Sequence, residues 1–587
     1  MDLIYEKWIP VRLADGTPDK IAPYEITREI ENEKRRIVAV ASPRPDFDGA
    51  LTQFLIGLLQ TACTPETEGK WWDWRESPPP PERLKEQFEP YKDAFYLFGD
   101  GKSWFMQENL ASTKNAKLHP VSYLLIGAAT DNALKTNTDH FQKRPKGEEA
   151  MCSSCAAAAL YTLQTFAPSG GGGGDGKFTS LRGGGPLTTI ILGKNLWETV
   201  WLNVLVKGDF DKKPCNEKTF PWLKLGHFLS EKAPVKSIHS SEMNSVHVYW
   251  GMPRRIQLQF SEVNTPCLCS VCGDLVSVQC RQYHDLSGGL TYQDGKGSKK
   301  GPSWISPLHP LSPYNIGEDN KPSAVHPQSG GIGYRHWLSY IENTAAGNFK
   351  RMPAKVIEQF RTIVREDGRM WAFGFDIASG QNKARCWYDS TMPILYIPSE
   401  QTSLLMGHAT NMVNSSRYVS GLILSSIFKA TMMEPVSKDG WQVIWNWPKD
   451  LLCHLKTSDQ EKTESVKAKI SVSGEELESR IEKNLLSKPI SIRNQFWSET
   501  EKGYFTALHQ IREALLSGAG EDDTLVKWLK LLQETAHHIF DIYSQDGDFD
   551  AVSPRSVALA RNELTFGLNG NFLRKKLGLP IINHHAP

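Results

Sequence analysis

Two pairs of cysteines with CxxC spacing are the residues of this 587-residue chain whose types and spacing best suit a defined chemistry. Cys152 and Cys155 form the first pair, and Cys269 and Cys272 form the second. A CxxC turn places two thiolates on one side of the backbone, at about the separation that tetrahedral zinc requires. Two such pairs close a four-cysteine site. Because this leaves no position for water or substrate, the spacing predicts a structural zinc ion.

Other interpretations of these cysteines remain open. Cys267 lies beside the second pair and is a possible substitute ligand. Four buried, unpaired thiols are the simplest alternative, and a thioredoxin-like redox pair is less favoured because neither pair lies in a βαβ context. The remaining cysteines are isolated, and we interpret them as core or surface residues: Cys63, Cys215, Cys280, Cys386 and Cys453.

A glycine-rich segment, FAPSGGGGGDGKFTSLRGGGPLTT at residues 166–189, begins shortly after the first pair. Its GxxxxGK match ends at Lys177, but Phe178 stands where a P-loop has the Ser or Thr that holds magnesium. A helix-like segment precedes the glycines, and LRGGGP follows, which cannot extend a helix. Two interpretations remain. The segment is a flexible linker, or it is a backbone surface that comes close to nucleic acid, with Lys177 and Arg182 supplying charge.

Catalytic motifs are missing from the sequence, which contains no HExxH, no GxSxG and no EF-hand loop. We therefore predict a binding or assembly protein and not an enzyme. A divergent P-loop NTPase is the enzyme alternative, and it would lose nucleotide hydrolysis on replacement of Lys177 by alanine.

The composition is that of an ordinary globular protein, with 40% hydrophobic and 23% charged residues. A net charge of +1 gives no overall attraction to nucleic acid or membrane, so nucleic-acid contacts would come from local patches or from partner subunits. No apolar run is long enough to span a membrane, and no signal peptide is recognisable. Ten cysteines grouped as CxxC pairs favour a reducing compartment, so we expect a cytoplasmic location.

The elements that position these residues change in character near residue 400. The sequence predicts an α+β fold, with a large irregular mixed domain over residues 1–395 that contains the structural zinc site, followed by an antiparallel helical bundle over 396–587. In the first domain we predict a helix over 48–62, with Asp46 or Asp48 as its N-cap. The other elements expected there are helices over 81–95 and 150–166, a strand over 186–193, strand-like alternation over 237–265 that is clearest over 246–250 and 255–260, and long loops over 284–332. The helices expected in the second domain cover 400–430, 474–488, 500–518, 523–545 and 554–575, with a polar connection over 435–473.

Several motifs occur in a shared order along the first domain. WIPV opens the chain, HFQKRPKGEEAMCSSC contains the first cysteine pair, and PLHPLSPY follows the second pair. The segment GFDIASGQNKARCWYDSTMPIL occupies 374–395. In this order, together with the glycine-rich segment, the chain resembles the large subunit of the type I-E CRISPR Cascade complex, the CasA family. The helical C-terminal region is similar to that family's four-helix bundle.

The resemblance implies a non-catalytic reader of DNA. Such a subunit inspects the protospacer-adjacent motif of double-stranded DNA from the minor groove and helps to open the duplex for the guide RNA. It works with the CRISPR RNA and the other Cascade subunits, and it later recruits a helicase-nuclease that degrades the target.

The resemblance also implies roles for individual residues. The DNA-contacting glycine loop falls on Gly170, Gly171, Gly172, Gly173 and Gly174. From their charge beside these glycines, and not from the resemblance, we expect Lys177 and Arg182 to contact the DNA backbone. The wedge that splits the first base pairs falls on Gln381, Asn382 and Lys383. Phe141 contacts the RNA handle and a neighbouring subunit, and the candidates for a minor-groove lysine are Lys296, Lys299 and Lys300. The metal ligands are Cys152, Cys155, Cys269 and Cys272. The alternative function is a zinc-stapled RNA-binding or scaffold protein in which the glycine loop is only a linker.

Overall fold

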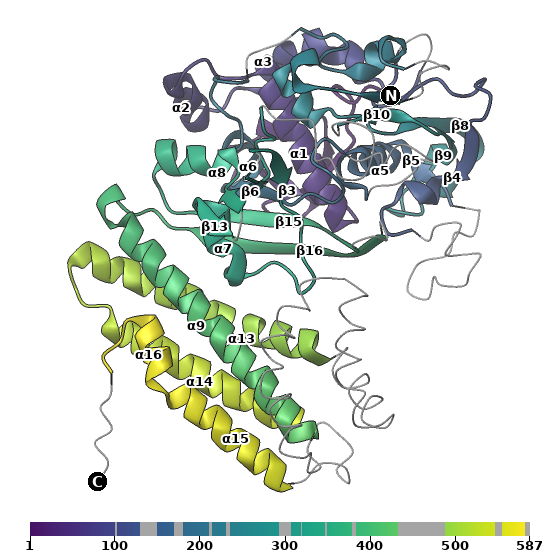
Figure 1. Cartoon of the computed structure of the whole chain (residues 1–587). Coiled ribbons are helices and arrows are strands. Elements are labelled where there is room, and N and C mark those ends of the chain that lie inside the picture. Colours follow the sequence, from purple (N-terminus) through teal and green to yellow (C-terminus); the bar gives the residue numbers. More distant parts are fainter. Residues whose placement is uncertain are drawn as a thin grey trace, which may run out of the picture. The chain divides into compact units, whose positions relative to one another are not determined.

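The computed structural model describes most of the chain in two compact units, Met1–Gln328 with Ser339–Ile394, and Ser329–Leu338 with Leu395–Pro587 (Figure 1). The fold mixes helices and strands, as the sequence predicts. The described residues are 1–99, 103–128, 149–168, 180–210, 214–229, 235–292, 307–318, 320–346, 349–378, 383–432, 488–545 and 554–581.

The core of the first unit is built around two buried helices, α1 (Pro45–Ala62) and α5 (Ser153–Phe166), which contact each other. Every residue of α1 except Pro45 and Asp48 is buried, as expected for a helix with apolar residues on all sides. Phe54 of α1 contacts the rings of Trp8, Phe95, Phe105, Tyr161 and Trp250 edge-on, at centroid distances of 5.4–5.9 Å.

The start of α1 differs from the prediction. Arg44 occupies the N-cap, and Pro45 is the first helical residue, where its missing N–H costs nothing. Asp46 and Asp48 lie within the first turn. Asp46 accepts two hydrogen bonds from Arg44, and Asp48 accepts one from the backbone N–H of Ser42. Both carboxylates therefore hold the segment that enters the helix.

The sheets of the first unit are small. Their strand orders are β2-β1-β3, β10-β7, β12-β11-β14-β13, β16-β15-β6 and β4-β9-β5, with β8 paired to β9. The strands are β1 (Ile9–Leu13), β2 (Pro18–Ile21), β3 (Ile37–Val40), β4 (Lys117–Pro120), β5 (Met151–Cys152), β6 (Thr188–Leu192), β7 (Val235–Ser237), β8 (Arg255–Leu268), β9 (Leu275–Leu286), β10 (Gly289–Thr291), β11 (Tyr314–Ile316), β12 (Pro322–Ala324), β13 (Thr344–Ala346), β14 (Phe349–Met352), β15 (Gly368–Ala378) and β16 (Lys383–Ile394). The shorter helices are α2 (Glu68–Glu76), α3 (Pro81–Phe88), α6 (Leu196–Trp201), α7 (Tyr334–Ile341) and α8 (Lys355–Gln359).

Two of the predicted strands are confirmed and one is wrong. The predictions over 186–193 and 255–260 correspond to β6 and to the start of β8. Residues 246–250 alternate like a strand, but Ser245–Tyr249 form a 3₁₀ helix. This 3₁₀ helix is buried on every side, since its buried residues include Val246, His247, Val248 and Tyr249. The alternating residue pattern, which suggests a strand with one buried face, therefore does not indicate a strand here.

Two long antiparallel hairpins carry the residues of functional interest. In the first, β8 pairs with β9 from Arg255↔Leu286 to Leu268↔Leu275, and the second cysteine pair lies in its turn. In the second, β15 pairs with β16 from Gly368↔Ile394 to Ala378↔Lys383, and β15 also pairs with β6. The connection between the two strands, residues 379–382, is called the tip; it includes Gln381 and Asn382 and lies outside the described residues, and Lys383 is the first residue of β16.

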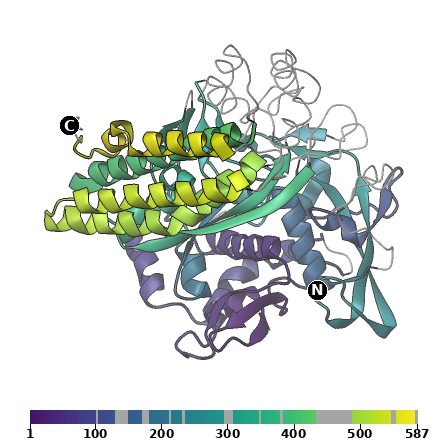
Figure 2. The same cartoon turned by 90° about the horizontal axis from the view of Figure 1, so that it is seen from below.

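The second unit is helical. Its helices α9 (Ser399–Met432), α13 (Lys488–Ser517), α14 (Asp522–Gln545), α15 (Pro554–Asn569) and α16 (Asn571–Leu577) pack side by side (Figures 1 and 2). Gly503 of α13 lies so close to α14 that a Cβ would be 2.1 Å from Leu531 Cδ2. The helices predicted over 400–430 and 523–545 are confirmed, α13 begins earlier than predicted, and Gly570 divides the last helix. The four-helix bundle stays a prediction, because residues 433–487 lie outside the described residues.

Within the described part of the chain, no helix combines the length and the apolar character needed to cross a membrane.

Candidate functional site

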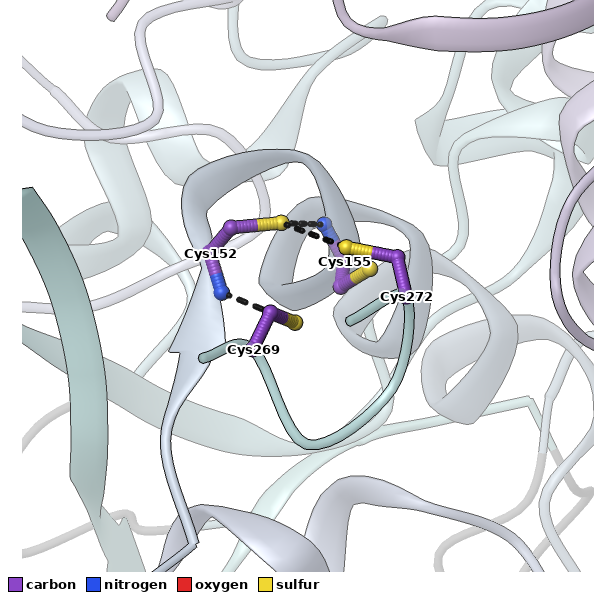
Figure 3. A group of neighbouring side chains, drawn as sticks. All are labelled: Cys152, Cys155, Cys269 and Cys272. Carbon is purple, nitrogen blue, oxygen red and sulfur yellow. Dashed lines mark hydrogen bonds between the residues drawn. The ribbon is translucent and has the colours of Figure 1, made fainter. Parts of the chain in front are cut away.

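The two cysteine pairs meet in the folded first unit. The Sγ atoms of Cys152, Cys155, Cys269 and Cys272 all lie within 4.8 Å of one another, and those of Cys152 and Cys272 are 3.8 Å apart (Figure 3). A tetrahedral zinc ion with Zn–S bonds of about 2.3 Å separates its sulfurs by about 3.8 Å. Three of the four cysteines are buried, so the cluster has the donor set and the dryness of a structural zinc site.

Local backbone geometry explains why the pairs converge. Cys152 is the N-cap of α5, and its Sγ accepts a hydrogen bond from the N–H of Cys155 at 3.3 Å. Across the cluster, Cys269 Sγ accepts one from the N–H of Cys152 at 3.3 Å. The β8–β9 turn closes through the Gly273 N–H, which donates to the Cys269 carbonyl, and Gly273 has a φ of +81° that favours glycine. The sequence CSVCG therefore encodes both the thiols and their turn.

The four thiols lie close enough to change one another's pKa. Hydrogen bonds with Cys152 and Cys269 raise the pKa of the Cys155 thiol, whereas hydrogen bonds from Cys152 and Cys155 lower the pKa of Cys269. The cysteines of the cluster therefore differ in acidity. A divalent cation would supply the positive charge that stabilises all four as thiolates.

Cys267 is not part of the cluster. Its Sγ donates to Gln279 Oε1 at 2.8 Å, across the β8–β9 ladder. Among the described residues, the four-cysteine group is the only cluster of three or more metal-ligating side chains. The candidate zinc ligands are therefore the four cysteines that the CxxC spacing predicts, without Cys267.

The glycine-rich segment joins α5 to β6. The predicted loop residues Gly170, Gly171, Gly172, Gly173 and Gly174, together with Lys177, lie outside the described residues. The described flanks run from a helix that ends at Phe166 to a strand that begins at Thr188. This order is the reverse of the strand and helix around a P-loop, so the flanks agree with the rejection of that motif.

Arg182 departs from the expectation. We predicted a contact with the DNA backbone, but the residue is only 3% exposed. Its Nη1 donates to Thr188 Oγ1 at 3.0 Å and to Ser312 Oγ at 2.9 Å. Its Nη2 donates to Gln53 Oε1 at 2.8 Å. Burial lowers the pKa of Arg182 to about 10. In this structure the guanidinium holds protein segments together and is not exposed at the surface.

The remaining predicted nucleic-acid residues are placed only in part. Gln381 and Asn382 lie outside the described residues, as do Phe141, Lys296, Lys299 and Lys300. Lys383 is the first residue of β16, where its backbone pairs with Ala378. The tip that carries the predicted wedge is thus bounded by a closed pair of strands.

An ion pair that was not predicted from the sequence lies next to this tip. Arg385 Nε and Nη2 donate to the two carboxylate oxygens of Asp376 at 3.0 and 2.6 Å, and Asp376 is only 2% exposed. The strands shift register between Asp376 and Ile377, directly beside this pair. The available signal was the placement of an acid and a base on opposite sides of a short glycine-containing turn, which is typical of cross-strand partners.

We expect Arg385→Met to lower the free energy of unfolding of the full chain by about 2 kcal/mol, because it removes the counter-charge of a buried carboxylate. Adding Asp376→Asn should recover most of this loss. Denaturant titration of the single and double variants measures both effects. Arg369→Met, an exposed replacement on the same hairpin, is the control and should change little. Additive losses in the double variant would contradict a direct pair.

The family model for CRISPR-associated protein Cse1 matches residues 2–539, which cover the first unit and reach α14 of the second. The chain belongs to the Cse1 family. Membership confirms the resemblance that the ordered motifs indicate.

Solved structures support the fold of this Cse1-family chain over nearly its whole length. CasA from Thermus thermophilus has a TM-score of 0.62 and 17% identity, and the match covers 97% of this chain and 99% of that chain. Cse1 from Thermobifida fusca has a TM-score of 0.66 and 14% identity, with 98% of each chain covered. A chain of a CRISPR RNA-guided surveillance complex has a TM-score of 0.58 and 13% identity, covering 97% and 99%.

Proposed function

We propose that this chain is the non-catalytic large subunit of a type I-E CRISPR RNA-guided surveillance complex. The observation that carries the proposal is the Cse1 family match over residues 2–539, which includes both hairpins, the cysteine cluster and most of the helical unit. A fold shared with a chain of a CRISPR RNA-guided surveillance complex, over 97% of this chain, supports the same role.

In this role the subunit recognises the protospacer-adjacent motif in double-stranded DNA from the minor groove. Gly170–Gly174 and Lys177 form one contact, and one of Lys296, Lys299 and Lys300 enters the groove. The minor groove distinguishes mainly A·T from G·C pairs, so we expect a tolerant motif and not a single sequence.

Duplex opening is assigned to Gln381 and Asn382 in the tip of the β15–β16 hairpin and to Lys383 beside it. A wedge must stay rigid while it separates stacked bases, which costs a few kcal/mol per step. The strand pairing resumes after the register shift beside Asp376 and extends to Ala378↔Lys383. This pairing and the Asp376–Arg385 ion pair support such a rigid base for the tip.

The proposed partners are the CRISPR RNA, which Phe141 contacts, the other subunits of the complex, and a helicase-nuclease recruited after target binding. A structural zinc ion held by Cys152, Cys155, Cys269 and Cys272 joins the start of α5 to the β8–β9 turn. The net charge of +1 fits a subunit that shares its nucleic-acid affinity with an assembly. We expect the complex in the cytoplasm.

The test is a gel shift with the complex purified from co-expressed subunits and guide RNA. Two duplexes carry the same guide-matched sequence, one with the correct flanking motif, found on a randomised flank, and one without it. We expect binding at least about tenfold tighter with the motif, which corresponds to about 1.4 kcal/mol. Equal binding to every flank would contradict motif recognition and favour the alternative, a zinc-stapled RNA-binding or scaffold protein with a linker-like glycine loop.

A further inference from the structure

The described ends of the glycine-rich segment, residues 166–168 and 180–189, are its flanks, and both contact the β15–β16 hairpin directly. Phe166, the last residue of α5, has its ring centroid 6.2 Å from that of Phe373 on β15 and 6.3 Å from that of Trp387 on β16. The rings of Phe373 and Trp387 stack at 5.4 Å. The end of α5 is therefore packed against both strands of the hairpin, at its centre and not at its edge.

The other flank contacts the same hairpin through its backbone. A Cβ added at Gly185 would lie 2.5 Å from Ile377 Cγ1 and 2.9 Å from the carbonyl oxygen of Phe375, both on β15. In the opposite direction, a Cβ at Gly374 would lie 2.8 Å from the carbonyl oxygen of Pro186. Two backbones approach each other here with no room for a side chain on either, close to the end of β15.

Arg182 holds these two flanks together. Its guanidinium lies 5.5 Å from the ring centroid of Phe166, the first residue of the segment, and Nη1 donates to Thr188, which starts β6 near the end of the segment. Gln53 of α1, which accepts from Nη2, also donates to Tyr161 Oη of α5 at 3.2 Å. Ser312, the third acceptor, donates to the Leu187 carbonyl at 2.6 Å. One side chain thus links α1, α5 and the start of β6.

A charge in this position is costly. The three acceptors of Arg182 are neutral, and its burial removes the guanidinium from water. A neutral core side chain would fill the same space without that desolvation. What arginine adds is a planar fork whose several N–H donors bond groups on three segments in one fixed arrangement.

We infer that Arg182 is a positioning residue that keeps the flanks of the glycine-rich segment in fixed register with the β15–β16 hairpin. The inference rests on the proposed function, and it adds a residue to it: Arg182, itself buried, provides the coupling between the segment that recognises the motif and the hairpin that opens the duplex. When Arg182 holds the flanks in place, DNA that is bound through its flanking motif reaches the hairpin tip at the correct position. With the register released, the two activities persist but no longer reinforce each other.

The first test uses Gly185→Ala, which pushes the flank against β15. Gly16→Ala is its matched control. Both glycines have a positive φ, +87° for Gly16 and +65° for Gly185, but a Cβ added at Gly16 would have no atom within 4 Å. Both variants carry the strain of a left-handed residue, and only one disturbs the hairpin contact. Arg182→Lys is the second variant, since it keeps the charge and loses the fork.

Each complex is measured on a closed duplex with the correct motif and on the same duplex already mismatched at the first base pairs. We expect Gly185→Ala and Arg182→Lys to weaken binding of the closed duplex by about tenfold and of the pre-opened duplex by less than about twofold, the scale of one buried hydrogen bond. Gly16→Ala should leave the ratio of the two affinities at the wild-type value. A purely structural role would lower both affinities together and leave that ratio unchanged.

The outcomes separate the inference from the proposed function. If the wild-type complex discriminates between flanks but Gly185→Ala matches Gly16→Ala in the affinity ratio, the coupling is wrong and the proposed function stands. If the wild-type complex does not discriminate between flanks, both are wrong. Should Arg182→Lys fail to assemble, the comparison of the two glycine variants decides the question.

Discussion

Replacement of Cys152 or Cys155 by serine is expected to remove one molar equivalent of zinc and to unfold the region that joins α5 to the β8–β9 turn. Structural zinc sites bind with an apparent free energy of about 10–16 kcal/mol, which matches or exceeds the roughly 5–15 kcal/mol that keeps a typical domain folded. Here the four sulfurs belong to the N-cap region of a core helix and to a distant hairpin turn, so losing the ion releases both. Metal analysis of the purified chain and its thermal unfolding curve measure the two effects.

Cys267→Ser is the matched control. Cys267 lies two residues before Cys269 on the same hairpin, but its thiol bonds Gln279 and not the cluster. This variant should retain the zinc equivalent and nearly the wild-type unfolding temperature. A wild-type chain without zinc, or a Cys152→Ser chain that retains it, would contradict the assignment.

The double replacement Gln381→Ala with Asn382→Ala is expected to weaken binding of a closed target duplex by about tenfold to hundredfold. The wedge offsets the cost of unstacking the first base pairs with new contacts, and each such step costs a few kcal/mol. A target already mismatched at those positions needs no unstacking, so its affinity should fall by less than about threefold. Equilibrium binding of the assembled complex to both targets measures the difference.

Thr391→Ala supplies the control for this experiment, since Thr391 is exposed on β16 and pairs with Trp371 far from the tip. It should bind both targets like the wild type. An equal loss on the closed and the pre-opened target in the double variant would remove the wedge assignment, even if the flanking motif is still recognised.

The metal site was the part of the molecule most open to prediction from sequence. CxxC spacing fixes the geometry within each pair, and Gly273 after Cys272 marks the turn that closes the second pair. Buried helices were also accessible, because α1 and α5 are runs of apolar residues long enough to exclude a strand. The CxxC turns and the apolar helices depend on residues that are close in the sequence, so they can be predicted without knowledge of the tertiary structure.

Other predictions failed where one pattern has two physical origins. The residue pattern over 246–250 has the period of a half-buried strand, yet Ser245–Tyr249 form a 3₁₀ helix, and all residues from 246 to 250 are buried. Asp46 and Asp48 have the side chains of an N-cap, yet Pro45 begins the helix before them. Each error arose because the identity of a residue does not state what surrounds it.

By itself, the sequence determined the family, the set of four clustered cysteines, the mixed fold and the change to long helices near residue 400. Only the tertiary structure decided that Arg182 is buried and that the flanks of the glycine-rich segment contact the β15–β16 hairpin. The physical reason is that an arginine beside glycines has the same sequence signature whether it meets a phosphate or a set of neutral oxygens. Gln53, Thr188 and Ser312 are brought together by folding alone, and their positions assign the guanidinium its role.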